Sequence, residues 1–308
     1  MNAQDNVLAT GFAFTEGPCI APDGTLYVTE LANRCVSRVV AGNREVFAEL
    51  GGSPNGAAFA ADGSLYVANG AGNWGANAST QGPGLGGGQA SIQRVQPSGD
   101  VETVLTAIDG VPLNSPNDIV GDSHGGFYFT DPSWPPLDEN NERDVSRVQP
   151  GSVCYLAADG SAVRLHSSFI FPNGIVISDD GTSLFVDETG TGLIHRFPIS
   201  EPGVVGEPEE YVDLGGMAAG PDGMAFDSAG RLLVAGHNAQ RVFVVAAGGG
   251  SVERELWFED PEVSNICFGG EDFRTVFVTQ ASLGRVVTLK WPVPGMRLHP
   301  DRTRVVQE

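Results

Sequence analysis

Residues 222–234 read DGMAFDSAGRLLV and carry the pattern that decides the fold: a polar residue, a short apolar strand, a tight turn and a very apolar triplet. The pattern occurs six times. The other copies are EGPCIAPDGTLYV (16–28), NGAAFAADGSLYV (55–67), NDIVGDSHGGFYF (117–129), NGIVISDDGTSLFV (173–186) and NICFGGEDFRTVFV (265–278). Their leading residues recur 39 to 62 residues apart, and such a period with several strands per unit predicts propeller blades.

Each copy supplies the parts of one blade. Asp-Gly pairs such as Asp62-Gly63 suit hairpin turns, because Gly accepts positive φ. The triplets are apolar throughout, as expected for strands buried between blades. A further strand follows each triplet: CVSRVV, SIQRVQ, SVCYLA, LIHRFP, RVFVV and RVVTLK. We therefore predict one all-β domain, a six-bladed β-propeller over residues 1–308, with the segment near 7–14 closing the ring in the last blade.

Composition restricts the partners and the location of the chain. Its net charge of −21 argues against nucleic acid and against anionic membrane surfaces, which need clustered Lys and Arg. Cys19, Cys35, Cys154 and Cys267 are scattered, which predicts neither a disulfide framework nor a cysteine zinc site. The first residues do not resemble a signal peptide, and no apolar stretch reaches membrane-spanning length, so we expect a cytoplasmic protein.

The leading residues of the six copies point to a metal site. In a propeller the innermost strands begin around one mouth of the central channel, so these six side chains converge: Glu16, Asn55, Asn117, Asn173, Asp222 and Asn265. All bear oxygen and none is cationic, which favours a hard divalent cation. The alternative is that the Asn-Gly and Asp-Gly pairs are turn residues, but Glu16 does not favour turns and the register repeats.

We predict Glu16, Asn117, Asn173 and Asp222 as the ligands of one divalent ion, with Asn55 and Asn265 supporting them or facing the substrate. Calcium is the best match to ligands that are all oxygen atoms. Mn²⁺, Mg²⁺, Zn²⁺ and Fe²⁺ stay open, since loading also depends on metal availability.

The motifs FTEGP (14–18), SPND (115–118), FPNG (171–174) and PDGMAFD (221–227) resemble those of the senescence-marker-protein/gluconolactonase family of six-bladed propellers. The likeness covers nearly the whole chain in order. It implies a lactone hydrolase that needs a divalent metal, with Glu16, Asn173 and Asp222 as ligands and Asn117 as a ligand or substrate contact. The more distant diisopropylfluorophosphatase and paraoxonase propellers share this layout.

The chain departs from that family at one position. Sugar-lactone members carry an Arg two residues before the Asn of blade three, where this chain has Ser115. Two insertions, 70–89 and 131–144, each with a tryptophan, are expected near the mouth of the channel. We therefore predict substrate contacts from Ser115, Asn117 and Asn55, and from three larger side chains at the mouth: Trp74, Trp134 and His237.

Asp222 is the candidate catalytic base, since a carboxylate at the metal can take a proton from an attacking water. Its alternative role is ligation alone. The resulting hypothesis is a hydrolase that opens a sugar lactone or a less polar lactone or ester. Two alternatives stay open at this point: a phosphotriesterase on the same metal site, or a non-catalytic propeller with a structural ion.

Overall fold

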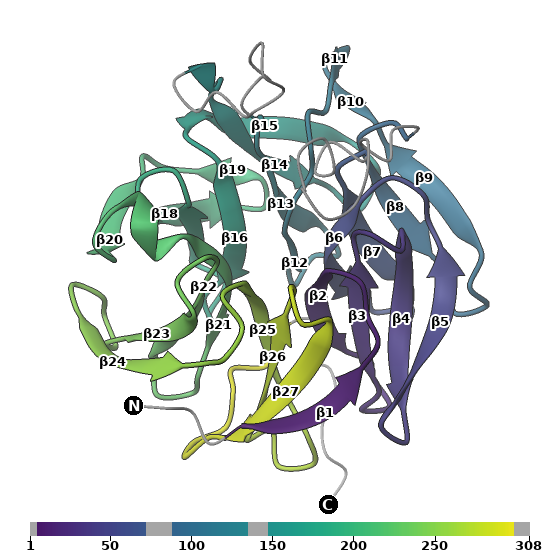
Figure 1. Cartoon of the computed structure of the whole chain (residues 1–308). Helices are drawn as coiled ribbons and strands as arrows, with labels where there is room; N and C mark the ends of the chain where they lie inside the picture. Colours follow the sequence, from purple (N-terminus) through teal and green to yellow (C-terminus); the bar gives the residue numbers. More distant parts are fainter. Residues whose placement is uncertain (1–4, 72–87, 135–146, 299–308) are drawn as a thin grey trace, which may run out of the picture.

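The computed structural model describes residues 5–71, 88–134 and 147–298. Within these ranges six small antiparallel sheets stand in a ring around a central channel, and Figure 1 views the ring along that channel. A six-bladed β-propeller is thereby confirmed. A two-stranded hairpin, β10 (Ala107–Ile108) and β11 (Val111–Pro112), and the 3₁₀ turn η3 (Met217–Ala219) lie outside the blades. No helix in the described part of the chain is long and apolar enough to cross a membrane.

Each blade runs from a strand at the channel to a strand at the rim. Blades one to three are β2 (Thr15–Ile20), β3 (Leu26–Glu30), β4 (Cys35–Val40) and β5 (Asn43–Glu49); β6 (Pro54–Phe59), β7 (Leu65–Asn69), β8 (Ser91–Val95) and β9 (Val101–Leu105); and β12 (Ile119–Gly121), β13 (Phe127–Asp131), β14 (Gly151–Leu156) and β15 (Ala162–Phe169).

Blades four to six complete the ring. Their strands are β16 (Pro172–Ile177), β17 (Ser183–Glu188), β18 (Leu193–Glu201) and β20 (Glu209–Asp213), with the short β19 (Val204–Val205) beside β18; β21 (Pro221–Phe226), β22 (Leu232–Gly236), β23 (Arg241–Val245) and β24 (Val252–Trp257); and β25 (Val263–Gly269), β26 (Thr275–Gln280), β27 (Arg285–Lys290) and β1 (Asn6–Thr10).

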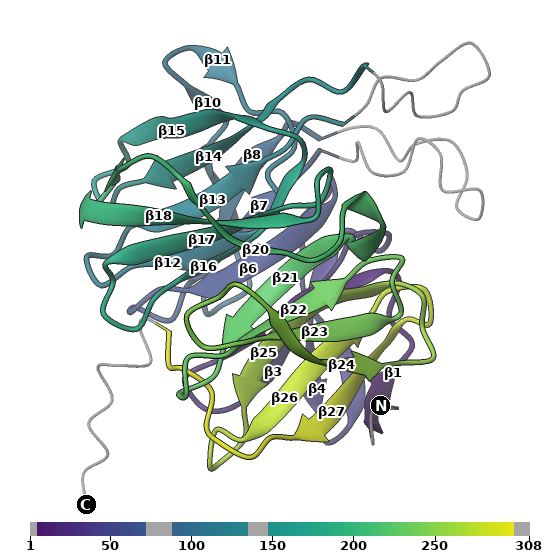
Figure 2. The same ribbon diagram turned by 90° about the vertical axis from the view of Figure 1, so that its left-hand side faces the viewer.

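The N-terminal strand closes the ring. β1 pairs antiparallel with β27, so that Asn6 lies opposite Thr288 and Thr10 opposite Arg285. Both views show β1 beside β27 (Figures 1 and 2). The predicted closure is confirmed, although the strand spans Asn6–Thr10 rather than residues 7–14. Pairing the two ends of the chain removes the open edge that β27 would otherwise expose.

The apolar triplets fill the space between blades. The residues that end the six triplets are fully buried: Val28, Val67, Phe129, Val186, Val234 and Val278. Each sits in an apolar cluster that spans neighbouring sheets, as where Phe226 of blade five stacks edge-on against Phe185 of blade four. The ring is therefore held by burial between blades, because the sheets share no backbone ladder with each other.

Glycines after the leading residues bring the blades close together. Gly56, Gly174 and Gly223 lie inside β6, β16 and β21, not in turns. A Cβ atom at these positions would collide with Asp118, the Asp222 backbone and Asn265, which belong to the following blades. The pairs Asn55-Gly56, Asn173-Gly174 and Asp222-Gly223 are thus sites where blades approach closely, and they are not turns as the alternative interpretation proposed.

Candidate functional site

A pocket of about 810 Å³ opens where the innermost strands begin. We call it the mouth pocket. Its floor is polar and its walls are largely apolar. The floor residues are Glu16, Asn55, Asn117, Asn173 and Asp222. The repeat register thus brings five of its six leading residues to one pocket.

The floor presents oxygen atoms that lack protein partners. The side chains of the four predicted ligands are buried, with exposed fractions between 3% and 6%. The amide oxygens of Asn55, Asn117 and Asn173 are buried and accept no hydrogen bond from the protein. Buried amide oxygens are normally satisfied, so three unsatisfied ones in a single pocket indicate a ligand.

The carboxylates around the channel mouth repel one another. Burial, reinforced by the charge of Asp118, raises the pKa of Glu16 to about 8. Burial raises the pKa of Asp118 to about 7. It also raises the pKa values of Asp222 and Asp187 well above the usual range, with added repulsion from neighbouring acids. No Lys or Arg of the described chain lines the mouth pocket, so this acidic cluster lacks a positive counterpart.

These residues fit a hard divalent cation. Glu16 and Asp222 would supply charge, and Asn117 and Asn173 would supply the neutral oxygens that now lack a partner. Among the described residues no three His, Cys, Asp or Glu side chains form a group arranged to hold a metal. The predicted ligand set contains only two such side chains, Glu16 and Asp222, together with two amides, so it is not one of these groups.

Neighbouring blades fix the backbone of the floor. The Thr29 hydroxyl donates to the carbonyl of Asn55 (2.5 Å), and the Thr130 hydroxyl donates to that of Asn173 (2.6 Å). Across the ring closure, Ser264 Oγ donates to the carbonyl of Thr15 (2.8 Å), directly before Glu16. At Asn55, at Asn173 and directly before Glu16, the backbone is thus held by the preceding blade, without relying on the side chains that face the pocket.

Buried acids at the ends of the second strands hold the loops that lead into the floor. Glu30 Oε2 accepts from Ala13 N (2.9 Å), and Asp131 Oδ1 accepts from Ser115 N (2.8 Å). Glu188 Oε1 likewise accepts from Ile170 N (2.5 Å). None of these acids lines the mouth pocket. They are positioning residues, and a buried carboxylate that accepts backbone N–H groups serves this purpose well.

The other predicted substrate contacts are distributed unevenly. His237 and Trp134 line the mouth pocket. His237 Nδ1 lies 3.7 Å from Asp222 Oδ2, beyond hydrogen-bond distance, and burial lowers the pKa of His237. Ser115 does not line the pocket; its Oγ accepts the Trp134 indole N–H (3.0 Å). Trp74 lies outside the described residues, as do most of 70–89 and 135–144.

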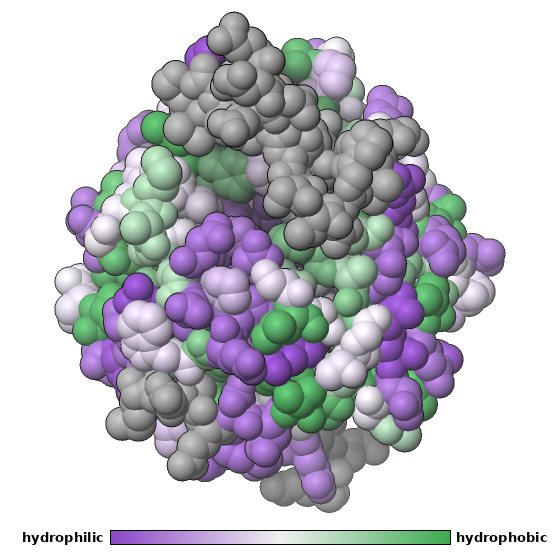
Figure 3. Space-filling model, viewed as in Figure 1, coloured by the Kyte–Doolittle hydropathy of each residue, from purple (hydrophilic) through white to green (hydrophobic). Residues whose placement is uncertain are grey.

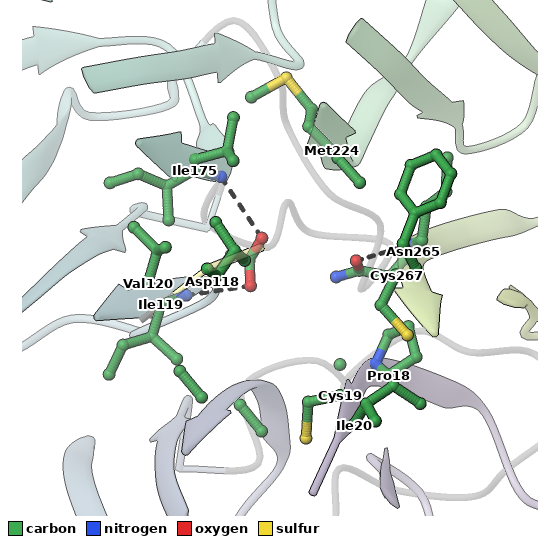
Figure 4. A pocket seen from close by; sticks show the side chains of 18 of the residues that line it. Pro18, Cys19, Ile20, Asp118, Ile119, Val120, Ile175, Met224, Asn265 and Cys267 are labelled. Carbon is green, nitrogen blue, oxygen red and sulfur yellow. Dashed lines mark hydrogen bonds between the residues drawn. The ribbon is translucent and has the colours of Figure 1, made fainter. Parts of the chain in front are cut away.

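Asn265 belongs to a second, smaller cavity deeper in the channel. This cavity of about 110 Å³ is lined mainly by apolar side chains, with Met296 and Leu298 among them. Figure 4 shows Asn265 and Asp118 on opposite sides of it; Asp118 accepts the backbone N–H groups of Ile119 and Ile175. The sixth leading residue therefore stands below the floor rather than in the mouth pocket.

Phe14 and Phe171 are wall residues that the motif analysis overlooked. Both line the mouth pocket, and each lies two residues before a predicted ligand, Glu16 or Asn173. The repeat contained the signal, because Ser115 stands at the same position of blade three. Comparing all six copies at that position, rather than blade three alone, would have found them.

The fold and the site together define a six-bladed β-propeller with an oxygen-lined, acidic pocket at one end of its channel. Sequence comparison identifies the family: residues 14–282 match the SMP-30/gluconolactonase/LRE-like region. The chain belongs to this family. The resemblance carried by the FTEGP, SPND, FPNG and PDGMAFD motifs is thereby confirmed.

Characterised relatives are moderately similar. The chain is 28% identical over 202 residues to a gluconolactonase of Zymomonas mobilis, which covers 62% of this chain and 55% of that protein. It is 26% identical over 209 residues to the diisopropyl-fluorophosphatase of Loligo vulgaris, which covers 66% of each. The matches thus span about half to two thirds of these relatives.

Solved structures agree in fold over nearly the whole chain. A gluconolactonase from Xanthomonas campestris superposes with a TM-score of 0.75 at 23% identity, covering 94% of this chain and 90% of that one. Regucalcin, a calcium-binding protein from Agrobacterium tumefaciens, gives a TM-score of 0.74 at 19% identity, covering 97% and 99%. At these identities the likeness concerns the fold.

Proposed function

We propose that this chain is a metal-dependent hydrolase that opens lactones at the mouth of its channel. The observation that carries the proposal is the floor itself. Two buried carboxylates, Glu16 and Asp222, stand with the unpartnered amide oxygens of Asn117 and Asn173 below an open pocket. Similarity to a gluconolactonase supports a lactone as substrate. Calcium suits the all-oxygen donor set best, and Mn²⁺, Mg²⁺, Zn²⁺ or Fe²⁺ would use the same donors.

Such an ion, when bound, supplies Lewis acidity that polarises a carbonyl and lowers the pKa of a water. Asp222 would take the proton of the water that attacks the lactone carbonyl. The ring C–O bond then breaks, and the leaving oxygen takes the proton back from Asp222, which gives the hydroxy acid. Burial lowers the pKa of His237, which favours its neutral imidazole, and His237 lines the same pocket, so it can hydrogen-bond the substrate.

The test combines lactone hydrolysis with metal removal in three variants. Glu16→Gln and Asp222→Asn remove one charge each from the floor, so both should lose at least about 100-fold in kcat/KM, as expected for loss of an electrostatic catalytic group. Both should also lose the rise in unfolding temperature that Ca²⁺ causes in the wild type. Asp180→Asn, in an exposed turn of blade four, is the matched control and should keep both properties.

Chelation of the wild-type protein should abolish hydrolysis, and added Ca²⁺ should restore it. Hydrolysis that survives thorough chelation would contradict the proposal. So would a Ca²⁺ response of the unfolding temperature that Glu16→Gln and Asp222→Asn leave unchanged.

A second candidate is hydrolysis of organophosphates on the same floor. The similarity to a diisopropyl-fluorophosphatase, at 26% identity over 66% of each chain, favours it. The same donors would then bind an ion that polarises P=O instead of C=O. Measuring fluoride release from a dialkyl fluorophosphate beside lactone hydrolysis separates the two, because each reaction has its own product.

A further inference from the structure

Two phenylalanines at the mouth pocket adopt a backbone conformation that is unfavourable for their type. Phe14 and Phe171 have φ values of 56° and 59°. The left-handed region is unfavourable for an L-residue, and bulky side chains are rare there. Both residues occupy the same place in the repeat, two positions before a predicted ligand. Such conformations persist only where the surrounding structure holds them.

Hydrogen bonds on both sides hold each phenylalanine. The carbonyl of Phe14 accepts from Leu31 N (3.1 Å), and the preceding Ala13 N donates to the buried Glu30. The carbonyl of Phe171 accepts from Thr189 N (3.1 Å), and the preceding Ile170 N donates to Glu188. Two blades thus use the same arrangement to direct a ring into one pocket, which indicates a role for the rings there.

The two rings join other apolar side chains into a wall. Phe171 packs edge-on against Trp134, with ring centroids 4.7 Å apart, and Phe14 lies 6.3 Å from the His237 ring. Further apolar residues line the pocket: Leu31, Val148, Ile170 and Met217. Ile170 is 41% and Met217 58% exposed, so apolar surface is open to a ligand at the rim.

Among the described residues, the mouth pocket offers few polar contacts of the kind a sugar would need above the floor. The described lining of the mouth pocket contains no Lys or Arg, and its polar side chains above the floor are Thr189, His237 and Asn238. Ser115 cannot replace them, because it lies outside the lining and pairs with Trp134. A polyhydroxylated ring would leave hydroxyl groups against apolar carbon, which is costly without hydrogen bonds.

We propose that the mouth pocket selects lactones with an apolar substituent, with Phe14 and Phe171 as specificity-determining residues. This inference rests on the proposed lactonase function. The lactone carbonyl faces the floor, and the alkyl or aryl substituent lies along the aromatic wall. The pocket volume of about 810 Å³ leaves room for a substituent of this kind beyond the lactone ring itself.

The test compares three six-membered lactones in the presence of Ca²⁺: δ-valerolactone, δ-decanolactone with its pentyl chain, and glucono-δ-lactone. Rates are taken above spontaneous hydrolysis. We expect kcat/KM for δ-decanolactone to exceed each of the others by about tenfold or more, because burying several CH₂ groups strengthens binding. Equal or higher kcat/KM for glucono-δ-lactone would overturn the substrate class while leaving the lactonase function intact. If no lactone is hydrolysed, the proposed function itself falls.

Phe171→Gly tests the wall, because Gly removes the ring and accepts the same positive φ. The preference for δ-decanolactone over δ-valerolactone should fall by about tenfold, as for a lost aromatic contact. Phe14→Gly should act in the same direction. Phe273→Gly is the matched control, since Phe273 has φ 56° but does not line the mouth pocket, and it should keep the preference. A preference unchanged in both wall variants would refute the assignment.

Binding provides a readout that does not depend on catalysis. The lactam analogues of the two aliphatic lactones resist hydrolysis, and their affinities can be measured by calorimetry with a chelator present. The pentyl lactam should bind about tenfold more tightly than the unsubstituted lactam, and Phe171→Gly should remove most of that difference. Equal affinities in the wild-type protein would count against an apolar wall.

Discussion

At Gly174 and Gly223, the absence of a Cβ atom lets neighbouring blades pack closely beside the channel. A Cβ atom on Gly174 would meet both the Asp222 backbone and Asp187 Oδ2, and one on Gly223 would meet Asn265. Neither glycine has positive φ, so the requirement is for space rather than for backbone freedom. The absence of a side chain after the leading residue therefore lets the innermost strands of adjacent blades approach closely.

Gly174→Ala tests this requirement. The added methyl group should displace Asp222, lower the free energy of unfolding by about 2 kcal/mol or more, and remove most of the Ca²⁺-induced rise in unfolding temperature. Denaturant unfolding and thermal melts with and without Ca²⁺ measure both effects.

Gly181→Ala in the same blade is the control. It has φ 72° and nothing within 4 Å of a new Cβ, so it should lose only about 1 kcal/mol through the backbone and keep the Ca²⁺ response. If Gly174→Ala behaves like Gly181→Ala, the close approach does not position the floor.

Strand β1 completes the last blade by pairing with β27. It covers β27, and its Ala9 is 3% exposed within an apolar cluster that includes Phe12, Val28 and Val286. Val7 on the same strand is 53% exposed. The pairing with β27 shifts register between Val7 and Ala9, so these two residues differ in burial although they are two positions apart. Substitutions at the two positions should therefore have different consequences.

Ala9→Asp should open the ring closure. A buried, unpaired carboxylate in this cluster should lower the free energy of unfolding by about 3 kcal/mol or more, and release of β1 should expose the edge of β27 to self-association. Urea unfolding and size-exclusion chromatography follow the two effects. Val7→Asp, at the exposed position, should stay within about 1 kcal/mol of the wild type. Equal losses in both variants would show that β1 is not packed as described.

Over the whole molecule, negative charge opposes the compact state. The chain carries a net charge of −21, and at least four of its carboxylates are buried around the channel: Glu16, Asp118, Asp187 and Asp222. On the face in Figure 3 hydrophobic residues form separate patches among hydrophilic ones. Long-range repulsion should therefore lower the free energy of unfolding by an amount that dissolved salt can reduce.

Monovalent salt should stabilise the metal-free protein. Raising ionic strength from about 10 mM to about 200 mM, with a chelator present, should raise the free energy of unfolding by about 1 kcal/mol because surface repulsion is screened. Urea midpoints in NaCl and in choline chloride should agree if the effect is general screening. A fall in stability, or a response to one salt only, would argue for specific ion binding instead.

The sequence by itself determined the propeller and the ring of donors. Six copies in constant register specify six blades, and the register places Glu16, Asn55, Asn117, Asn173 and Asp222 at one mouth, because innermost strands of a closed ring begin at the same end. A cytoplasmic location and the identity of the ion remain predictions. This part of the site follows from the repeat, which can be read from a single sequence.

Only the tertiary structure decided what surrounds those donors. It placed Asn265 below the floor, paired Ser115 with Trp134, and gave Glu30 and Glu188 to the loops that hold Phe14 and Phe171. In each case the contacting residues belong to different strands or blades. Their separation along the chain therefore does not predict the contact. The repeat predicts the position of the site, while the packing between the repeats sets the shape of the pocket above it.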